Sequence, residues 1–147
     1  MNGRTRSIHQ PGLALRMQRE IRVIAAQHRQ LDAFYARVAA AVHGDEPDEA
    51  RTAFARFADA LEAHFALEDG LYFPALCGLR PSFARHLESL SDEHQQIRER
   101  LAGVARLVEA GVCAECARPL EGLAGDIAAH EGREEELLGS IQKEGTS

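Results

Sequence analysis

The chain has 147 residues with a formal net charge of −6 and a pI near 5.6, and 45% of the residues are hydrophobic while 27% are charged. This length suits one domain with a sizeable core, and the acidic balance argues against a nucleic-acid or anionic-membrane partner. No apolar run reaches the roughly 20 residues of a membrane span, and three cysteines without framework spacing make the cytoplasm the expected location.

Residues 1–12 are polar, lack the apolar stretch of a secretory signal, and are expected to form a flexible N-terminal arm. The first helix follows and is predicted to end at Gly44. Its apolar residues recur at alternating steps of four and three, which marks one buried helix face, here called the seam. His28 is the only strongly polar residue in this seam. The seam residues are Met17, Ile21, Ile24, His28, Leu31, Tyr35, Val38 and Val42.

The second helix is predicted to open near Pro47 and to run to about Phe73-Pro74. Its seam is interrupted by His64 and Glu68, which are four residues apart and therefore share the face that points at the core. A buried imidazole beside a buried carboxylate is unfavourable unless each group finds a partner. The seam residues are Phe54, Phe57, Leu61, His64, Glu68 and Leu71.

The third helix is predicted to run from an N-cap at Ser82 to Gly111, with His94 as its one polar seam residue. Cys113 to Pro119 is predicted to be a loop, and its Cys-x-x-Cys pair is interpreted as an ordinary loop pair, with a redox or metal-handling role as the alternative. The seam residues are Phe83, Leu87, Leu90, His94, Ile97, Leu101, Val104 and Val108.

The fourth helix again carries a histidine and a glutamate four residues apart in its seam, His130 and Glu134. Residues 142–147 are a polar tail. The neighbouring acidic residues fall off the seam and are interpreted as a solvated face: Glu131, Glu135 and Glu136. The seam residues are Leu120, Leu123, Ile127, His130, Glu134, Leu137 and Ile141.

These four amphipathic helices, joined by short links, predict an all-α, up-down-up-down antiparallel four-helix bundle over residues 13–141. The polar seam residues repeat at one offset. His28 and His94 are 66 positions apart, and so are His64 and His130. Glu68 and Glu134 are separated by 66 positions as well. One helical hairpin is thus used twice, and we expect a pseudo-twofold arrangement with a polar layer at the middle of the bundle.

Four histidines and two glutamates at core positions indicate a dinuclear metal site. Imidazoles with bridging carboxylates suit iron, manganese or zinc, and six ligands on two ions leave open positions for a small molecule. The alternative is that each histidine is an ordinary core residue with its own hydrogen-bond partner. Six such groups at repeated seam positions favour the metal. The predicted ligands are His28, His64, Glu68, His94, His130 and Glu134.

At these residues the chain resembles the hemerythrin-like, or HHE cation-binding, domain family over residues 13–141. The motifs that carry the resemblance are Gln27-His28, His64-x-x-x-Glu68 followed by Leu71-Tyr-Phe-Pro74, Asp92-Glu-His94 and His130-x-x-x-Glu134. The four-His, two-Glu set is similar to that of the di-iron domain of iron–sulfur cluster repair proteins. The resemblance implies two iron ions (Fe2+/Fe3+) bridged by the two glutamates. An oxo or hydroxo group is a further bridge that such a pair of ions can have. Manganese and zinc remain alternatives.

The chain also departs from patterns found among related proteins. Oxygen-carrying hemerythrins have a fifth histidine one turn away on the third helix, where this chain has Leu90 and Arg98. Reversible dioxygen transport is therefore not expected. The 147 residues leave no room for the cysteine-bearing N-terminal domain of the repair proteins, so their repair activity is not expected to carry over as a whole. The Glu-x-x-His motif of ferritin-like oxidases is absent from the four ligand histidines, so such an oxidase is not expected either.

Three hypotheses for function follow. The first is a di-iron protein that binds dioxygen or nitric oxide in sensing, scavenging or iron handling. The second is an enzyme that reduces nitric oxide or peroxide with an unidentified redox partner, including a role in iron–sulfur cluster repair. The third is an interaction module with a structural metal. No acid or base in the seams beyond the ligands supports proton delivery, which favours the first hypothesis.

Overall fold

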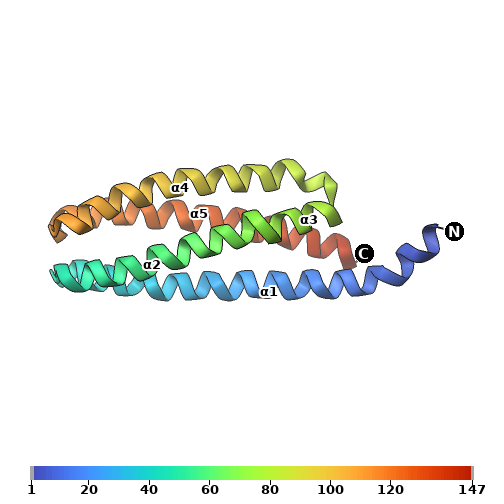
Figure 1. Cartoon of the computed structure of the whole chain (residues 1–147), viewed down its shortest axis with the longest axis horizontal. Coiled ribbons are helices and arrows are strands. Elements are labelled where there is room, and N and C mark those ends of the chain that lie inside the picture. Colours follow the sequence, from blue (N-terminus) through green and yellow to red (C-terminus); the bar gives the residue numbers. More distant parts are fainter. Residues whose placement is uncertain (1, 147) are drawn as a thin grey trace.

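The computed structural model shows four long helical segments lying side by side along one axis (Figure 1). It describes the backbone of residues 2–146, the side chains of residues 15–140 and the exposure of Gly12. The backbone described over that range contains no strand, so the predicted all-α bundle is confirmed. The elements are α1 (Asn2–His43), α2 (Pro47–Leu67), the π-helical turn η1 (Glu68–Tyr72), α3 (Phe73–Leu79), the 3-10 turn η2 (Pro81–Phe83), α4 (Ala84–Ala110) and α5 (Cys113–Thr146).

The segments α2, η1 and α3 form one continuous rod, so the bundle has four rods joined by three short connections. The α1 rod packs against α2 and α5, and α4 packs against α5 and α2. Gly111 ends α4 in the left-handed conformation at φ 79°, which a residue without a Cβ adopts at no steric cost. The short turns make consecutive rods antiparallel, as predicted.

The prediction that Cys113–Pro119 forms a loop is wrong, because α5 begins at Cys113. The buried face of α5 starts at Cys113, seven residues before Leu120, the first predicted seam residue. Cys113, Cys116 and Leu120 are 4%, 1% and 3% exposed, and their steps of three and four continue the seam. The two cysteines thus act as small hydrophobic residues in the first turns of the helix. Pro119 lies inside that helix, on a half-buried position.

The second rod also differs from its prediction. It contains a π turn at Glu68–Tyr72, and it continues past Pro74 to Leu79. A π turn inserts one residue into the helical repeat and shifts the register of everything after it. Leu71 was predicted to lie in the seam, but it is 55% exposed, while Tyr72 and Phe73 are 8% and 4% exposed. The π turn therefore rotates Leu71 outward and supplies the core with the next two residues.

The core has two apolar clusters with a polar layer between them. The larger cluster includes Leu31, Leu61 and Ile97, and the smaller includes Ile24 and Leu90. The histidines of α1 and α4 lie between these residues in sequence, so the polar layer is near the middle of the bundle, as expected.

The helical backbone extends over most of residues 1–12 and 142–147, where the sequence predicts an arm and a tail. The secondary structure does not test mobility, so these two assignments stay predictions. The predicted seam residue Ile141 lies outside the described side chains. Within the part of the chain that the structure describes, no helix combines the length and the apolar character needed to cross a membrane.

Candidate metal centre

All six polar seam residues meet in the layer between the two apolar clusters. Each is between 0% and 3% exposed, although histidine and glutamate are usually at least partly solvated. One histidine comes from each of the four rods, and the glutamates come from the second and fourth rods. The sequence prediction that these residues lie together is correct for His28, His64, Glu68, His94, His130 and Glu134.

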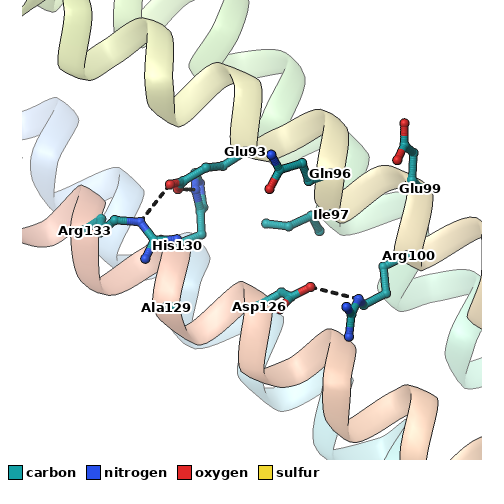
Figure 2. A pocket seen from close by; sticks show the side chains of 9 residues that line it. All are labelled: Glu93, Gln96, Ile97, Glu99, Arg100, Asp126, Ala129, His130 and Arg133. Atoms are coloured by element: carbon teal, nitrogen blue, oxygen red, sulfur yellow. Dashed lines mark hydrogen bonds and ion pairs between the residues drawn. The ribbon is translucent and has the colours of Figure 1, made fainter.

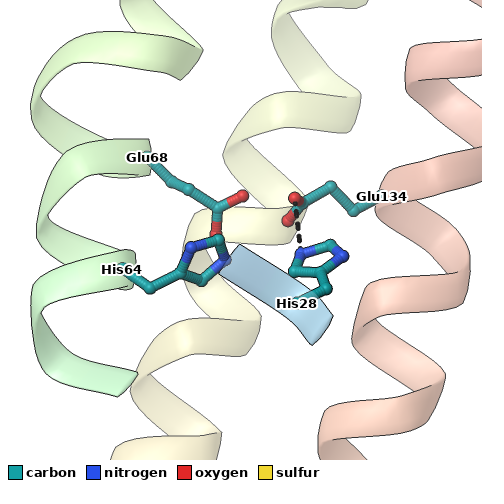
Figure 3. A group of neighbouring side chains, drawn as sticks. All are labelled: His28, His64, Glu68 and Glu134. Atoms are coloured by element: carbon teal, nitrogen blue, oxygen red, sulfur yellow. Dashed lines mark ion pairs between the residues drawn. The ribbon is translucent and has the colours of Figure 1, made fainter. Parts of the chain in front are cut away.

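The six side chains form two overlapping groups that each could hold a metal ion. Position A consists of His28 and His64 with the two glutamates, and position B consists of His94 and His130 with the same two glutamates. Within each group the ligand atoms lie within 4.8 Å of one another. Figure 3 shows the side chains of position A pointing toward a common centre from three rods. Both groups share Glu68 and Glu134, which is the arrangement that a dinuclear site with bridging carboxylates requires.

The inward-facing atoms contact one another through ring Nε2 and carboxylate oxygens. His28 Nε2 lies 3.2 Å from Glu134, and His64 Nε2 lies 3.1 Å from Glu68. In position B, His94 Nε2 is 3.1 Å from Glu68, and His130 Nε2 is 3.4 Å from Glu134. These contacts place four nitrogen donors around two carboxylates.

Many of these inward-facing atoms have no hydrogen bond despite their burial. They include both carboxylate oxygens of Glu68 and Glu134 and the Nε2 atoms of His28 and His64. Buried polar atoms normally have a partner, so this cluster requires one that supplies positive charge at several atoms together. A metal cation meets that requirement.

The pair His94 and His130 supports the same conclusion. Their Nε2 atoms face each other at 3.1 Å, while both Nδ1 atoms contact carboxylates. A carboxylate can only accept, so in the neutral rings each Nδ1 carries the proton and each Nε2 presents a lone pair. Two lone pairs at this distance repel each other unless a proton or a metal cation lies between them. Burial opposes the charged form of His130, but Glu134 and Glu93 outweigh it and raise the pKa of His130, so a proton on its Nε2 makes this hydrogen bond in the metal-free site and a bound cation would replace that proton. Nitrogen ligands about 2.1 Å from a shared ion are spaced in this way, by about 3 Å.

The two glutamates have opposite pKa shifts. Burial, together with the neighbouring Glu134 carboxylate, raises the pKa of Glu68. Burial alone would raise the pKa of Glu134 as well, but the contacts with His130 and His28 outweigh it and lower that pKa. Two buried carboxylates this close resist ionising together unless positive charge compensates them. A divalent cation would allow both to be anionic.

The pKa values of the histidines are also shifted in opposite directions. Burial lowers the pKa of His64 to about 4, so its ring is neutral and suited to metal ligation at physiological pH. Burial also lowers the pKa of His94. For His28, burial opposes the charged form, but the Glu134 carboxylate outweighs it and raises the pKa to about 9. A metal at position A would have to displace that proton.

The Nδ1 atom on the outer edge of each histidine ring also has a contact, which was not predicted from the sequence. Each Nδ1 contacts a side-chain oxygen from a neighbouring rod, the arrangement that orients histidine ligands in metal sites. His28 contacts Glu135 at 3.3 Å, and His64 contacts Gln27 at 2.6 Å. His94 contacts Asp69 at 2.9 Å, and His130 contacts Glu93 at 2.7 Å. The sequence contains one signal that could have identified these four partners: each directly precedes or follows a predicted ligand.

The interpretation of the acidic residues on α5 as a solvated face is correct for Glu135 and Glu136, which are exposed, and wrong for Glu131. Glu135 also contacts His28 from this exposed position. Glu131 is half-buried, and its Oε1 is buried and makes no hydrogen bond. Burial raises the pKa of Glu131 to about 7, while the charge of His28 opposes that shift. A carboxyl outside the six-residue set therefore interacts through its charge with His28 of position A.

A polar groove of about 490 Å³ lies between α4 and α5 next to position B. Figure 2 shows Glu93 in its wall, bonded both to His130 and to Arg133. Burial would raise the pKa of Glu93, but His130 and Arg133 outweigh it and lower that pKa, so Glu93 is a carboxylate. This residue connects the buried ring of His130 to the groove.

The Cys-x-x-Cys pair, Tyr35 and His43 lie outside the two groups of possible metal ligands. Cys113 and Cys116 form no disulfide and pack in the larger apolar cluster, outside the two groups of possible metal ligands. Tyr35 packs edge-on against Phe57 and reaches the carbonyl of Leu120 at 3.5 Å, so it fills the core. His43 is exposed, and His9 lies outside the described side chains.

Comparison with known protein families matches the model of the hemerythrin HHE cation-binding domain to residues 19–141. The chain belongs to this family. The match covers most of the bundle and all six buried histidines and glutamates, so the resemblance inferred from the sequence is confirmed. Hemerythrin-like domains bind metal cations, and the buried cluster of this member fits such a site. No curated protein and no solved structure matches the chain.

Proposed function

We propose that this hemerythrin-like protein holds two iron ions and binds a diatomic ligand, dioxygen or nitric oxide, in sensing, scavenging or iron handling. The observation that carries this proposal is the sharing of Glu68 and Glu134 by two groups of possible ligands. In the proposal, position A and position B each hold one ion, and the two glutamates bridge them. Bound iron would supply redox activity and the coordination positions that six protein ligands leave open.

The donor set suits iron without excluding manganese or zinc, because imidazole and carboxylate donors suit all three metals and no thiolate is among the six buried residues. The resemblance to di-iron domains is what favours iron. A family that binds cations and a layer of unpartnered donor atoms support a metal of this kind. Metal analysis distinguishes iron from manganese and zinc.

A small cavity supports a small ligand. It lies among α1, α2 and α5, has a volume of about 60 Å³, and is lined by Leu31, Tyr35 and Glu131 among others. This volume is about twice the share of one molecule in liquid water, which is ~30 Å³. None of the six proposed ligands lines this cavity, but Leu31, one of its lining residues, is one turn from His28. A diatomic molecule fits in a cavity of this size.

A second candidate function is the reduction of nitric oxide or peroxide, including a part in repairing iron–sulfur clusters. Glu131 favours it, because reduction consumes protons and this carboxyl lies beside the site without being one of the six proposed ligands. Glu131 lies outside the seams, so the lack of further acids and bases in the seams does not exclude it as a proton donor. The three free cysteines are compatible with the reducing cytoplasm expected from the sequence.

Stopped-flow spectroscopy of the reduced, iron-loaded protein with dioxygen, nitric oxide and peroxide distinguishes these functions. The binding proposal expects a stable adduct that consumes one equivalent of ligand. Repeated turnover with an added reductant would establish the enzyme instead. The absence of any spectral response would contradict both and leave a structural metal.

Two variants sharpen the test. Glu131→Gln should leave the iron content and the adduct unchanged if the protein only binds its ligand, and should slow turnover if it is an enzyme. Glu121→Gln is the matched control, because Glu121 is an exposed glutamate on the same helix.

A further inference from the structure

The internal repeat extends beyond the six buried residues to the side chains that hold the rings from outside. Gln27 contacts His64, and Glu93, 66 positions later, makes the equivalent contact with His130. Asp69 contacts His94, and Glu135, again 66 positions later, contacts His28. Each outer partner thus has a counterpart in the other half, and the two positions can be compared contact by contact.

The outer contacts of the two positions differ in charge. Position B has a carboxylate on each histidine, at 2.9 Å from Asp69 and 2.7 Å from Glu93. Position A has the neutral amide of Gln27 on one ring. Its other ring has a longer contact, 3.3 Å, with Glu135, whose side chain is 61% exposed.

The partners in position B are also better held. The Ser91 hydroxyl donates to Asp69 at 2.7 Å, and Arg133 donates to Glu93 at 2.7 Å. Arg133 and Arg98 offset part of the charge on these carboxylates. However, Arg133 is 54% exposed and Arg98 is 25% exposed, so solvent screens their effect on the buried centre. The contacts between the rings and the carboxylates are direct, so they influence the charge at the buried centre more strongly than the two arginines do.

The packing against the rings differs in the same sense. Phe65 stacks on His94 with ring centroids 4.0 Å apart, and Phe73 stacks near the same ring at 5.7 Å. The residues 66 positions later are Glu131 and Gly139, so the first half of the chain supplies the only aromatic pair at these equivalent places. Position B therefore has its His94 ring fixed by packing as well as by its outer partner.

These differences have one consequence for a bound cation. A carboxylate that accepts from Nδ1 fixes the ring tautomer and makes Nε2 a stronger donor, whereas an amide can turn its NH2 toward the ring. Loss of such a partner typically lowers metal affinity by about 10–100-fold. We propose that the two positions are inequivalent and that position B binds its ion first and more tightly, with Glu93 and Gln27 as the positioning residues that set this order.

The inference rests on the proposed function only in requiring that both positions bind metal. It is tested by anaerobic titration of the metal-free protein with Fe2+, followed by calorimetry, with 57Fe Mössbauer spectra at one and two equivalents. The wild type should bind two ions in separate steps and show one dominant quadrupole doublet at one equivalent. Two ions bound with a single affinity would overturn the inference but keep the di-iron proposal. Binding of fewer than two ions would instead overturn the di-iron proposal.

Variants that exchange the charged and neutral side chains at positions 27 and 93 assign each iron-binding step to position A or position B. Glu93→Gln should weaken the tighter step, and Gln27→Glu should strengthen the weaker one, each by about 10–100-fold. The double exchange, Gln27→Glu with Glu93→Gln, should reverse the order of loading. Glu99→Gln removes the same charge from the same groove at an exposed residue and should leave both steps unchanged. An effect of Glu93→Gln on the weaker step, or an equal effect of Glu99→Gln, would refute the assignment.

Discussion

Phe65 stacks on His94, with ring centroids 4.0 Å apart and 17° between the ring planes. The residue at the equivalent place in the second half of the chain, 66 positions later, is Glu131. Its carboxyl is near enough to His28, the counterpart of His94, for the charge of His28 to oppose the rise in the pKa of Glu131. One side of the proposed centre is therefore closed by an aromatic ring, and the other is polar and adjoins a small cavity.

This stacking can be tested by truncating the ring. Phe65 is 1% exposed, so Phe65→Ala should lower the free energy of unfolding by about 3–5 kcal/mol. It should also weaken metal retention at position B, because His94 loses its packing. Phe54→Ala, at another buried phenylalanine of α2, is the control and should lower stability without changing metal affinity. Denaturant unfolding and metal titration of both variants measure these effects, and equal metal affinities would count against the role of Phe65.

The π turn predicts that two leucines at equivalent positions of the repeat respond differently to truncation. Leu71 is 55% exposed and Leu137 is 8% exposed. Leu71→Ala should change the free energy of unfolding by less than about 0.5 kcal/mol. Leu137→Ala should lower it by about 2–5 kcal/mol. Comparable losses in the two variants, measured by urea unfolding, would mean that the second rod has an ordinary α-helical register.

The thiols of the folded protein should differ in reactivity. Cys113 and Cys116 are buried, and burial raises the pKa of the Cys116 thiol. Because the thiolate is the reactive form, a raised pKa moves alkylation of Cys116 to higher pH than for an ordinary thiol. Cys77 is half-buried and should react first with iodoacetamide. Mass spectrometry of the labelled protein between pH 7 and pH 9 gives the order, and rapid labelling of Cys116 at pH 7 would contradict the buried assignment.

Removal of the metal should destabilise the bundle without unfolding it. The apolar clusters on both sides of the polar layer remain intact, so the helical circular dichroism signal should persist in chelator. The melting temperature should fall, because a ligand present at 100 times its dissociation constant stabilises the folded state by about 2.7 kcal/mol. A melting temperature that is the same with and without chelator would indicate that no metal stabilises the fold.

The parts of the structure that follow from periodicity could be predicted from the sequence. His28, His64, His94 and their partners replace apolar residues in regular seams, and the common offset of 66 showed that the two halves would meet. The start of α5 could not be predicted in this way, since a Cys-x-x-Cys pair followed by a proline resembles a loop. The exposure of Leu71 depends on a π turn, for which the residues alone give no periodic signal.

The outer partners of the histidines were missed for a different reason. Gln27, Asp69 and Glu93 lie off the seams, where charged and amide side chains are ordinarily solvated, so only the packing of neighbouring rods reveals their contacts. Their assignment from sequence would have required extending the repeat by one residue beyond each predicted ligand.

The most direct test is the iron content per chain after anaerobic loading with Fe2+ and removal of excess metal, in the wild type, Glu68→Ala and Glu134→Ala. Because both carboxylates are shared by the two groups, the account predicts two iron ions in the wild type and at most one in each variant. A wild type that retains no metal, or variants that keep the full content, would contradict a carboxylate-bridged pair of ions at this centre.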